Sequence, residues 1–424
     1  MKSRLLVLVM IVSLVLTACG GAKVPASNAP ATISMMMWGD PAELEVWNQI
    51  VADFHQTNPN ITVKVEVSDW DSYWTKLKTL LSADTPPDVF AMDAPLYLDY
   101  QSRGVLLNLQ PYLDKNPDML KGVYPQTLDA YKTSDGMYGL PRDFQTIVLF
   151  YNKDMFDAAG VTYPTANWTY DDLRSAAKQL TKDSNGDGKI DQFGFYSDLW
   201  DMELIWSEAI WAYGGDIISA DHARTLVGEP KAREAWQLFH DMMFVDKSWP
   251  DSTTAGEYGG DPFLAGVAAM TTIGHWAVPG YAETNFKWDV VPMPKGPTGQ
   301  ATSVNSAGFV VGKASKNPDA AFEFLKYVLS EPAQKRLAEL GFACPVLKSV
   351  AESDSFLKQS TQIDEKVFLD SLSFAHMKPV FKGYDEWSSA IGDGMATIWT
   401  GETELGPTLD EAVSAADEVL ASNK

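Results

Sequence analysis

The chain has 424 residues, too many for one ordinary hydrophobic core and enough for two domains. Apolar residues make up 46% and charged residues 21%, so a disordered chain, collagen and a coiled coil are excluded. The formal net charge of −23 repels phosphate backbones and anionic lipid headgroups. We therefore expect no nucleic-acid partner and no electrostatic binding to a membrane surface.

The N-terminus carries an export signal. Lys2 and Arg4 precede an apolar run over residues 5–16. That run is too short to span a bilayer as a helix, and its flanks fit a secretory signal peptide over residues 1–18.

The residues around Cys19 resemble a bacterial lipobox, with Ala18 before the cysteine and Gly20 after it. The resemblance implies a diacylglycerol on Cys19, and acyl chains of this kind give stable membrane anchoring. Residues 19–32 are small and poor in apolar side chains, which is typical of a tether. The predicted location is extracytoplasmic and membrane-anchored, and a plain signal peptide cleaved at an Ala-x-Ala site is the alternative. Cys344 then lacks a disulfide partner, and we expect it to be a buried small apolar residue.

The next part of the chain alternates between predicted strands and helices. Apolar residues at 33–37, strict alternation at 61–67 and a buried run at 88–92 predict three strands. Asp40-Pro41-Ala42-Glu43 has the composition of a helix start, and Trp74, Leu77 and Leu81 have helical spacing. Strand–helix–strand order predicts a parallel sheet with right-handed crossovers.

Beyond residue 138 the same kinds of element recur. They are a strand at 147–151, a helix from Thr169, helices from Asn317 and Ser330, and a mostly helical segment after Trp387. No period of 20 to 50 residues repeats, which excludes a solenoid or a propeller. The predicted architecture is two α/β lobes, and such sheets bind ligands in the crevice at strand C-terminal ends.

Several segments resemble one family in their order and spacing. They are Gly139-Leu140-Pro141, residues 149–154, residues 263–270 followed by Gly274-His275-Trp276, residues 292–297, residues 307–309 and the helix at 320–325. Together they are similar to the extracellular solute-binding proteins (family 1) of ABC importers, in the branch that includes maltodextrin-binding lipoproteins.

The resemblance implies a periplasmic-binding-protein type II fold, with a ligand cleft between lobes joined by three hinge crossings. We place the crossings near residues 143–145, 303–308 and 352–356. The N-terminal lobe is then 33–143 with 308–352, and the C-terminal lobe is 144–307 with 353–424. The expected function is that of a monomeric, non-enzymatic protein that binds a sugar and delivers it to an ABC permease by hinge closure.

A sugar ring presents an apolar face and an equator of hydroxyls, so its recognition uses aromatic faces beside polar groups. We predict ligand contacts from residues that follow predicted strands or lie at the first crossing: Trp38, Asp40, Asp93, Arg142 and Gln145. The loop after the second predicted strand adds Trp70. The resemblance adds two stacking tryptophans, Trp276 and Trp387, and further candidates at Trp200 and Trp206. We expect Trp38, Trp276 and Trp387 to converge on one gap between the lobes, and the carbohydrate hypothesis fails if they lie in unconnected interiors and no gap separates the lobes.

Alternatives remain for these residues. Asp40 also fits a helix cap, and Arg142 could pair with Asp143 inside the hinge. Gln145 stands where maltodextrin binders carry a carboxylate, which argues against maltose itself.

Residues 183–191 resemble the start of a calcium-binding loop, and structural Ca²⁺ is the one cofactor considered. Oxygen ligands fall at positions 1, 3, 5, 7 (a backbone carbonyl) and 9, which are Asp183, Asn185, Asp187, Lys189 and Asp191. Position 12 is Gly194 where a glutamate is expected. A polar turn stabilised by Asx hydrogen bonds is the alternative.

Two other classes of function compete with sugar binding. A solute-binding protein for a polyamine, a peptide or a glycerol-phosphate derivative would share the fold. A glycoside hydrolase would need two carboxyl groups flanking one bond. The sequence contains no Gly-x-Ser-x-Gly, phosphate loop or His-Glu-x-x-His motif that would point to other chemistry.

Overall fold

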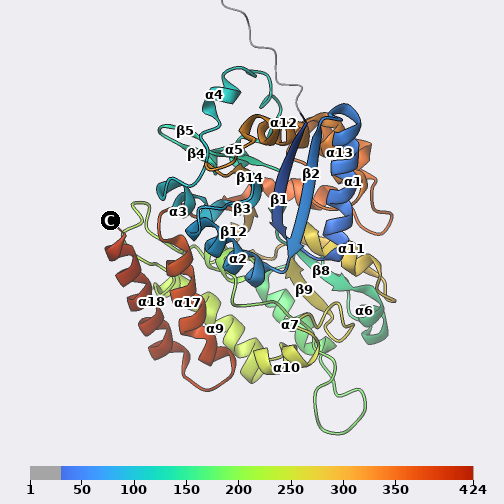
Figure 1. The fold of residues 1–424 in the computed structure, drawn as a ribbon. Coiled ribbons are helices and arrows are strands. Elements are labelled where there is room, and N and C mark those ends of the chain that lie inside the picture. The colour runs from blue at the N-terminus through green and yellow to red at the C-terminus, as the bar shows by residue number, and fades with distance from the viewer. Residues whose placement is uncertain (1–29, 424) are drawn as a thin grey trace, which may run out of the picture.

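The computed structural model describes residues 30–423, so the predictions for the signal peptide, Cys19 and most of the tether lie outside the described residues. Its larger sheet has the strand order β2-β1-β3-β14-β6. The strands are β1 (Ala31–Trp38), β2 (Ile61–Ser68), β3 (Val89–Asp93), β6 (Gly139–Pro141) and β14 (Ala307–Val311). Around this N-terminal lobe pack α1 (Pro41–Thr57), α2 (Trp70–Ser82), α12 (Pro318–Val328) and α13 (Glu331–Glu339) (Figure 1).

The predicted helix start at Asp40 is confirmed. The Asp40 carboxylate accepts hydrogen bonds from the backbone amides of Ala42 (2.7 Å) and Glu43 (2.8 Å), and the Glu43 carboxylate accepts one from the Asp40 amide. Such a capping box satisfies amides that have no partner inside the helix. The opposite face of α1 buries Trp47, whose ring meets Phe309 of β14 edge-on at 4.9 Å.

The sheet is parallel only in part. β1 pairs in parallel with β2 and β3, as predicted, but β14 runs antiparallel to both β3 and β6. The reason is topological, because β14 returns from the second lobe and enters the sheet from its other end.

The C-terminal lobe is built on a three-stranded sheet in the order β10-β8-β9, in which both pairings are antiparallel. Its strands are β8 (Val148–Asn152), β9 (Met270–Ile273) and β10 (Trp288–Pro292). Its helices are α6 (Lys153–Ala159), α7 (Tyr170–Leu180), α8 (Trp206–Ala212), α9 (Pro230–His240), α10 (Ser252–Glu257), α11 (Val278–Ala282), α17 (Tyr384–Trp399) and α18 (Leu405–Ser422). The last two helices lie side by side next to α9 (Figure 1).

Shorter elements connect these units. They are a 3₁₀ turn at Ala94–Leu96, α3 (Tyr97–Ser102), α4 (Gln110–Leu113), α5 (Pro125–Asp129), β4 (Lys132–Thr133), β5 (Gly136–Met137), a π-helix at Asp241–Val245, a 3₁₀ turn at His275–Ala277, β11 (Lys295–Gly296), β12 (Gly299–Gln300), α14 (Lys348–Ala351), α15 (Asp354–Leu357), α16 (Lys366–Asp370) and a 3₁₀ turn at Ser371–Phe374.

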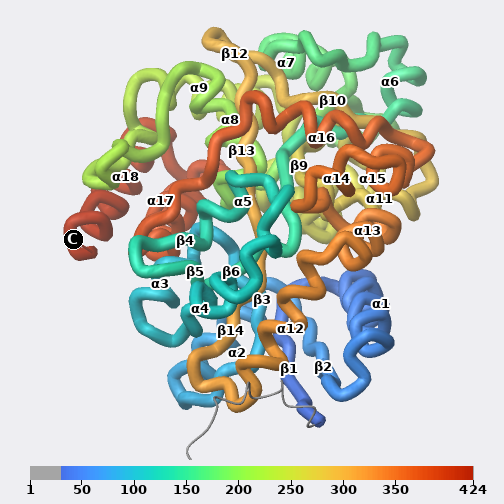
Figure 2. The backbone as a smooth tube through the Cα atoms, turned by 90° about the horizontal axis from the view of Figure 1, so that it is seen from above, coloured from blue at the N-terminus to red at the C-terminus, as the bar shows by residue number. Residues whose placement is uncertain are grey.

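A small sheet joins the two lobes. β13 (Thr302–Asn305) lies between β7 (Gln145–Thr146) and β15 (Ala375–Met377). In Figure 2, β13 is central, with β1, β2 and α1 towards one end of the molecule and α6, α7 and β10 towards the other. The first two predicted crossings adjoin β7 and β13, whereas 352–356 lies outside this sheet, at α14 and α15. The lobe boundaries stay a prediction. Cys344 is buried and free, as expected, and burial raises the pKa of its thiol.

Glu208 of α8 supports the joining strand β13 from inside the C-terminal lobe. Its carboxylate accepts hydrogen bonds from the backbone amide of Ser303 (3.0 Å) and the hydroxyl of Ser207 (3.0 Å). The side chain is fully buried, and burial raises the pKa of Glu208 from 4.5 to about 7. The folded protein therefore binds the proton of this carboxyl more tightly than the unfolded chain does.

This shift predicts a pH-dependent effect of Glu208→Gln. The stabilising contribution of a raised carboxyl pKa is complete below pH 4.5 and is lost as the pH rises through 7. Glutamine does not titrate and keeps an acceptor for the Ser303 amide. We expect the free energy of unfolding of the variant, relative to wild type, to rise by about 3 kcal/mol between pH 4.5 and pH 8, as measured by urea unfolding. Glu45→Gln, on the exposed side of α1, is the control for the loss of one carboxyl. An equal pH-dependent change in its free energy of unfolding would contradict the assignment of the effect to the raised pKa of Glu208.

Candidate functional site

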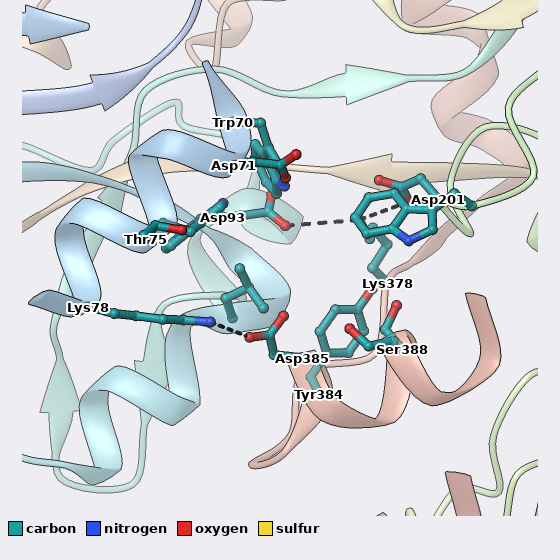
Figure 3. A pocket seen from close by; sticks show the side chains of 14 residues that line it. Trp70, Asp71, Thr75, Lys78, Asp93, Asp201, Lys378, Tyr384, Asp385 and Ser388 are labelled. Carbon is teal, nitrogen blue, oxygen red and sulfur yellow. Dashed lines mark hydrogen bonds and ion pairs between the residues drawn. The ribbon is translucent and has the colours of Figure 1, made fainter. Parts of the chain in front are cut away.

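A cavity of about 350 Å³ lies between the two lobes. One wall comes from α2, the end of β3 and the turn that follows it, and the other from α17, the loop at 200–201 and Lys378 (Figure 3). The lining residues are Trp70, Asp71, Trp74, Thr75, Lys78, Asp93, Leu96, Trp200, Asp201, Lys378, Tyr384, Asp385, Ser388 and Ser389. Aromatic rings and hydrogen-bonding groups therefore meet in one interlobe space.

The two faces of α2 have different roles. Tyr73 and Leu77 are fully buried in the core of the N-terminal lobe, while Trp70 and Trp74 line the cavity, Trp74 with only 7% of its surface exposed. Behind them lies Trp38, at the end of β1. Its ring stacks on Trp74 at 5.6 Å and meets Trp70 edge-on at 4.9 Å. Trp38 thus holds the two cavity indoles in place without lining the cavity itself.

Lys378 forms the charged centre of the cavity. Its ammonium lies 3.2 Å from the Glu203 carboxylate, 3.8 Å from Asp201 and 3.9 Å from Asp93. Asp93 belongs to the N-terminal lobe and the other two acids to the C-terminal lobe. The Lys378 side chain is only 5% exposed, so these attractions are little screened by water. The Asn305 amide also donates to Asp93 (2.6 Å), which holds that carboxylate at the cavity floor.

Burial and charge act against each other in this cluster. Burial raises the pKa of both Asp93 and Glu203, while Lys378 acts to lower them. Burial also acts to lower the pKa of Lys378, but Asp201, Glu203 and the other acidic neighbours raise it well above its ordinary value. The ammonium is therefore charged at every physiological pH, and with a pKa of about 8 Glu203 holds a proton for much of that range.

The start of α17 contacts the N-terminal lobe in two places. Lys78 of α2 forms an ion pair with Asp385 at 3.0 Å, across the cavity (Figure 3). The backbone amide of Gly383 donates to the buried Asp99 carboxylate of α3 at 2.7 Å. Gly383 has φ +88°, a left-handed conformation that glycine adopts without strain. The described conformation is thus one in which the lobes meet around the cavity.

Comparison with known proteins identifies the family. The model of the family described as "Bacterial extracellular solute-binding protein" matches residues 38–335. The chain belongs to this family. A putative binding protein of Brucella abortus (strain 2308) is 28% identical over 88% of this chain and 89% of its own length. The galactooligosaccharide-binding protein of Bacillus subtilis (strain 168) is 24% identical over 98% of this chain and 96% of its own length.

Solved structures agree on the fold. An ABC substrate-binding protein from Listeria monocytogenes, solved in complex with cycloalternan, is 26% identical, covers 93% of this chain and 99% of its own, and has a TM-score of 0.85. The predicted family and the predicted α/β two-lobe fold are confirmed. Among the described residues, no helix of this solute-binding protein is both long enough and apolar enough to cross a membrane.

The structure brings three of the predicted contact residues to the cavity, namely Trp70, Asp93 and Trp200. Trp38 lies behind it. Asp40 is exposed at the start of α1 and acts as the helix cap, which was the alternative interpretation. Trp276 is half-buried after β9, where its ring covers Gly274, and it does not line the cavity.

The predictions for Trp206 and Trp387 as cleft residues are wrong. Trp206 is 1% exposed and its ring packs against Trp236 at 5.2 Å. Trp387 is fully buried, and its indole N–H donates to the Thr225 hydroxyl at 2.9 Å. Each belongs to a helix whose packing face points into the C-terminal lobe. The predicted convergence of Trp38, Trp276 and Trp387 therefore does not occur, although a gap flanked by indoles of both lobes is present.

Arg142 and Gln145 are hinge residues in this structure and do not line the cavity. The guanidinium of Arg142 is buried among the rings of Trp38, Trp47 and other aromatic residues, and its Nε lies 2.9 Å from the Asp143 carboxylate. This is the internal pair that the sequence left open. Burial raises the pKa of Asp143 to about 6. Gln145 is buried on β7, and its side-chain oxygen has no hydrogen-bond partner among residues 30–423.

Sequence reasoning missed most of the cavity. On α2, Trp70, Trp74 and Lys78 are spaced four residues apart, a signal for one shared helix face that could have been used. The same spacing joins Tyr384 to Ser388 on α17. Lys378 follows the short strand β15 and carries no local signal.

The loop at 183–191 has the geometry of a hydrogen-bonded turn. Asp183 accepts from the backbone amides of Gly186 (2.6 Å) and Gly188 (2.7 Å), and Asp191 accepts from Ser184 (2.7 Å). In the described part of the chain, no three acidic, histidine or cysteine side chains are gathered as metal ligands would be. The arrangement matches the turn interpretation, and calcium binding stays a prediction.

Proposed function

We propose that the protein is the extracytoplasmic substrate-binding lipoprotein of an ABC importer, and that it binds a di- or oligosaccharide in the interlobe cavity. The observation that carries this proposal is the meeting of Trp70 and Trp74 from one lobe with Trp200 from the other, beside carboxylates and an ammonium. Indole faces match the apolar face of a sugar ring, and charged groups match its hydroxyls. The relatives named for galactooligosaccharide and cycloalternan support the same class of ligand.

The cavity is lined by side chains of both lobes, so a bound ligand would favour closure of the hinge between them. A ligand that contacts both lobes binds the closed state more tightly than the open one, and only such differential affinity shifts the equilibrium between them. The sugar would stack on Trp70 and Trp74 from the N-terminal lobe and on Trp200 from the C-terminal lobe. Asp71 and Ser388 would hold its hydroxyls. The closed protein then presents a surface that the permease subunits recognise.

The charged cluster supports binding over catalysis. A glycoside hydrolase places two carboxyl groups on either side of the scissile bond. Here Asp93, Asp201 and Glu203 are gathered around one ammonium, which ties them to Lys378. We therefore propose a binding protein and not a glycoside hydrolase. Its anchor is the lipid on Cys19, its tether ends where β1 begins at Ala31, and it acts as a monomer.

A thermal-shift screen tests the ligand class. The panel contains maltose, maltotriose, mannotriose, galactobiose and diacetylchitobiose, with spermidine, a dipeptide and glycerol 3-phosphate as competing solutes. A sugar present at 100 times its Kd should raise the melting temperature by about 3 °C, because it binds only the folded state. A shift with spermidine, the dipeptide or glycerol 3-phosphate and with no sugar would contradict the proposal. Release of shorter sugars on incubation would favour the hydrolase.

A further inference from the structure

A second cavity, of about 280 Å³, lies within the C-terminal lobe. Its walls come from the loop at 196–200, the π-helix at Asp241–Val245 and the segment from Trp249 through α10 to Gly260. No residue of the N-terminal lobe lines it. The cavity is therefore formed by one lobe and does not depend on how the two lobes are placed.

Trp200 connects this cavity to the interlobe one, because it lines both. It is 51% exposed, the highest value for any tryptophan among residues 30–423. Its position is fixed nonetheless. Its backbone amide donates to Asp198 at 2.8 Å, and its backbone and ring lie against Gly392 of α17, where an added Cβ would come within 3.1 Å of the Trp200 carbonyl oxygen. A fixed and exposed indole between two cavities can stack sugar rings that extend from one to the other.

The far wall of the second cavity is also aromatic and rigid. Trp249 is 2% exposed, and its ring meets Phe195 at 4.7 Å and Phe239 at 5.5 Å. Tyr196 is held by a hydrogen bond from its hydroxyl to the Gly260 carbonyl at 2.9 Å. These contacts preserve the shape of the cavity without a ligand.

The cavity also offers an unused acceptor. One carboxylate oxygen of Asp198 accepts from the Trp200 amide, and the other has no hydrogen-bond partner in the described part of the chain. Ser252 supplies a hydroxyl on the same wall. The second cavity thus places an indole beside a carboxylate, as the interlobe cavity does, but without a cation from residues 30–423 paired to that carboxylate.

We propose that this second cavity is a further sugar subsite, so that the ligand is a glycan of at least three rings that passes over Trp200. The inference rests on the proposed function and specifies the length of the substrate. One ring is held by the C-terminal lobe alone and the remaining rings lie between the lobes. Because this subsite exists in both open and closed states, it adds affinity without shifting the hinge equilibrium.

Gly256→Leu tests the subsite by filling it. Gly256 lies on α10 and lines the second cavity, and an added Cβ there meets no atom within 4 Å. The matched control is Gly280→Leu on α11, which also meets no atom within 4 Å and lines a separate cavity beside Leu264 and Phe286. Isothermal titration uses the glycan series that binds wild type in the thermal screen, from two to five rings.

The expected result depends on glycan length. Wild type should bind the trisaccharide at least tenfold more tightly than the disaccharide. Gly256→Leu should remove that gain and leave disaccharide affinity within twofold of wild type, while Gly280→Leu changes neither. Asp198→Asn is the second variant. It keeps the acceptor for the Trp200 amide and should weaken trisaccharide binding about fivefold, without changing disaccharide binding.

Three outcomes overturn the proposal. The first is a wild-type protein that binds the trisaccharide no more tightly than the disaccharide. The second is a Gly256→Leu protein that still binds the trisaccharide more tightly than the disaccharide. The third is a Gly256→Leu protein whose affinity falls by the same factor for glycans of every length. In each of these cases sugar binding itself stands. If wild type binds no glycan of any length, the proposed function fails and the subsite fails with it.

Discussion

Lys378→Met is expected to lower the free energy of unfolding by about 3–5 kcal/mol at pH 8. The substitution keeps the apolar stem and removes the one ammonium that Asp93, Asp201 and Glu203 share. The acids then lie close together in a buried site with no cation. Unfolding in urea, followed by circular dichroism, measures the loss.

The pH dependence of this effect distinguishes lost charge from lost packing. At pH 5 the carboxyls of Asp93 and Glu203, whose pKa values burial already raises, can take up protons when the ammonium is absent. The loss should therefore be smaller at pH 5 than at pH 8. Lys78→Met is the matched control, because Lys78 lines the same cavity but is 52% exposed where it pairs with Asp385. It should cost less than about 1 kcal/mol. Equal losses for the two variants, or a loss independent of pH, would contradict the central role of Lys378.

Trp70→Ala is expected to weaken sugar binding about 30-fold. A tryptophan ring that shares about 80 Å² of apolar surface with a sugar contributes about 2 kcal/mol, which corresponds to that factor. Trp70 is half-buried at the start of α2, whereas Tyr73 and Leu77, which anchor the helix in the core, are fully buried. Isothermal titration with the sugar found in the thermal screen gives the affinity.

Trp276→Ala is the control for Trp70→Ala, because Trp276 is also half-buried but lies outside the cavity. Its affinity should stay within about threefold of wild type. If Trp276→Ala abolishes binding and Trp70→Ala does not, the sugar binds beside β9 and the interlobe cavity is not the site.

The elements that the sequence predicted well are those fixed by local patterns. The capping box at Asp40 and Glu43 forms as expected, and the alternation at 61–67 becomes β2, paired along its whole length with β1. Helix caps and strand alternation depend on residues a few positions apart, so the sequence carries them directly. The antiparallel entry of β14 into the first sheet has no such local signal.

The predictions for the candidate site were likewise correct for some residues and wrong for others. Trp70 was predicted from the loop after the second strand and Trp200 from the family resemblance, and both line the cavity. Trp387 was predicted from the resemblance, at the start of a late helix. On a helix each residue is rotated by about 100° from the one before, so Tyr384 and Ser388 share the cavity face while Trp387 points into the lobe.

The sequence by itself therefore determined the family, the two-lobe α/β fold and the abundance of indoles suited to a sugar. Composition, motif order and short-range periodicity can be identified without knowing the tertiary structure. Only the tertiary structure decided which indoles reach the ligand cavity and that Lys378 gathers Asp93, Asp201 and Glu203. These residues are distant in sequence, and they meet only because the joining strands bring the two lobes together. Side-chain direction and long-range packing, which no local pattern encodes, decide which residues line the cavity.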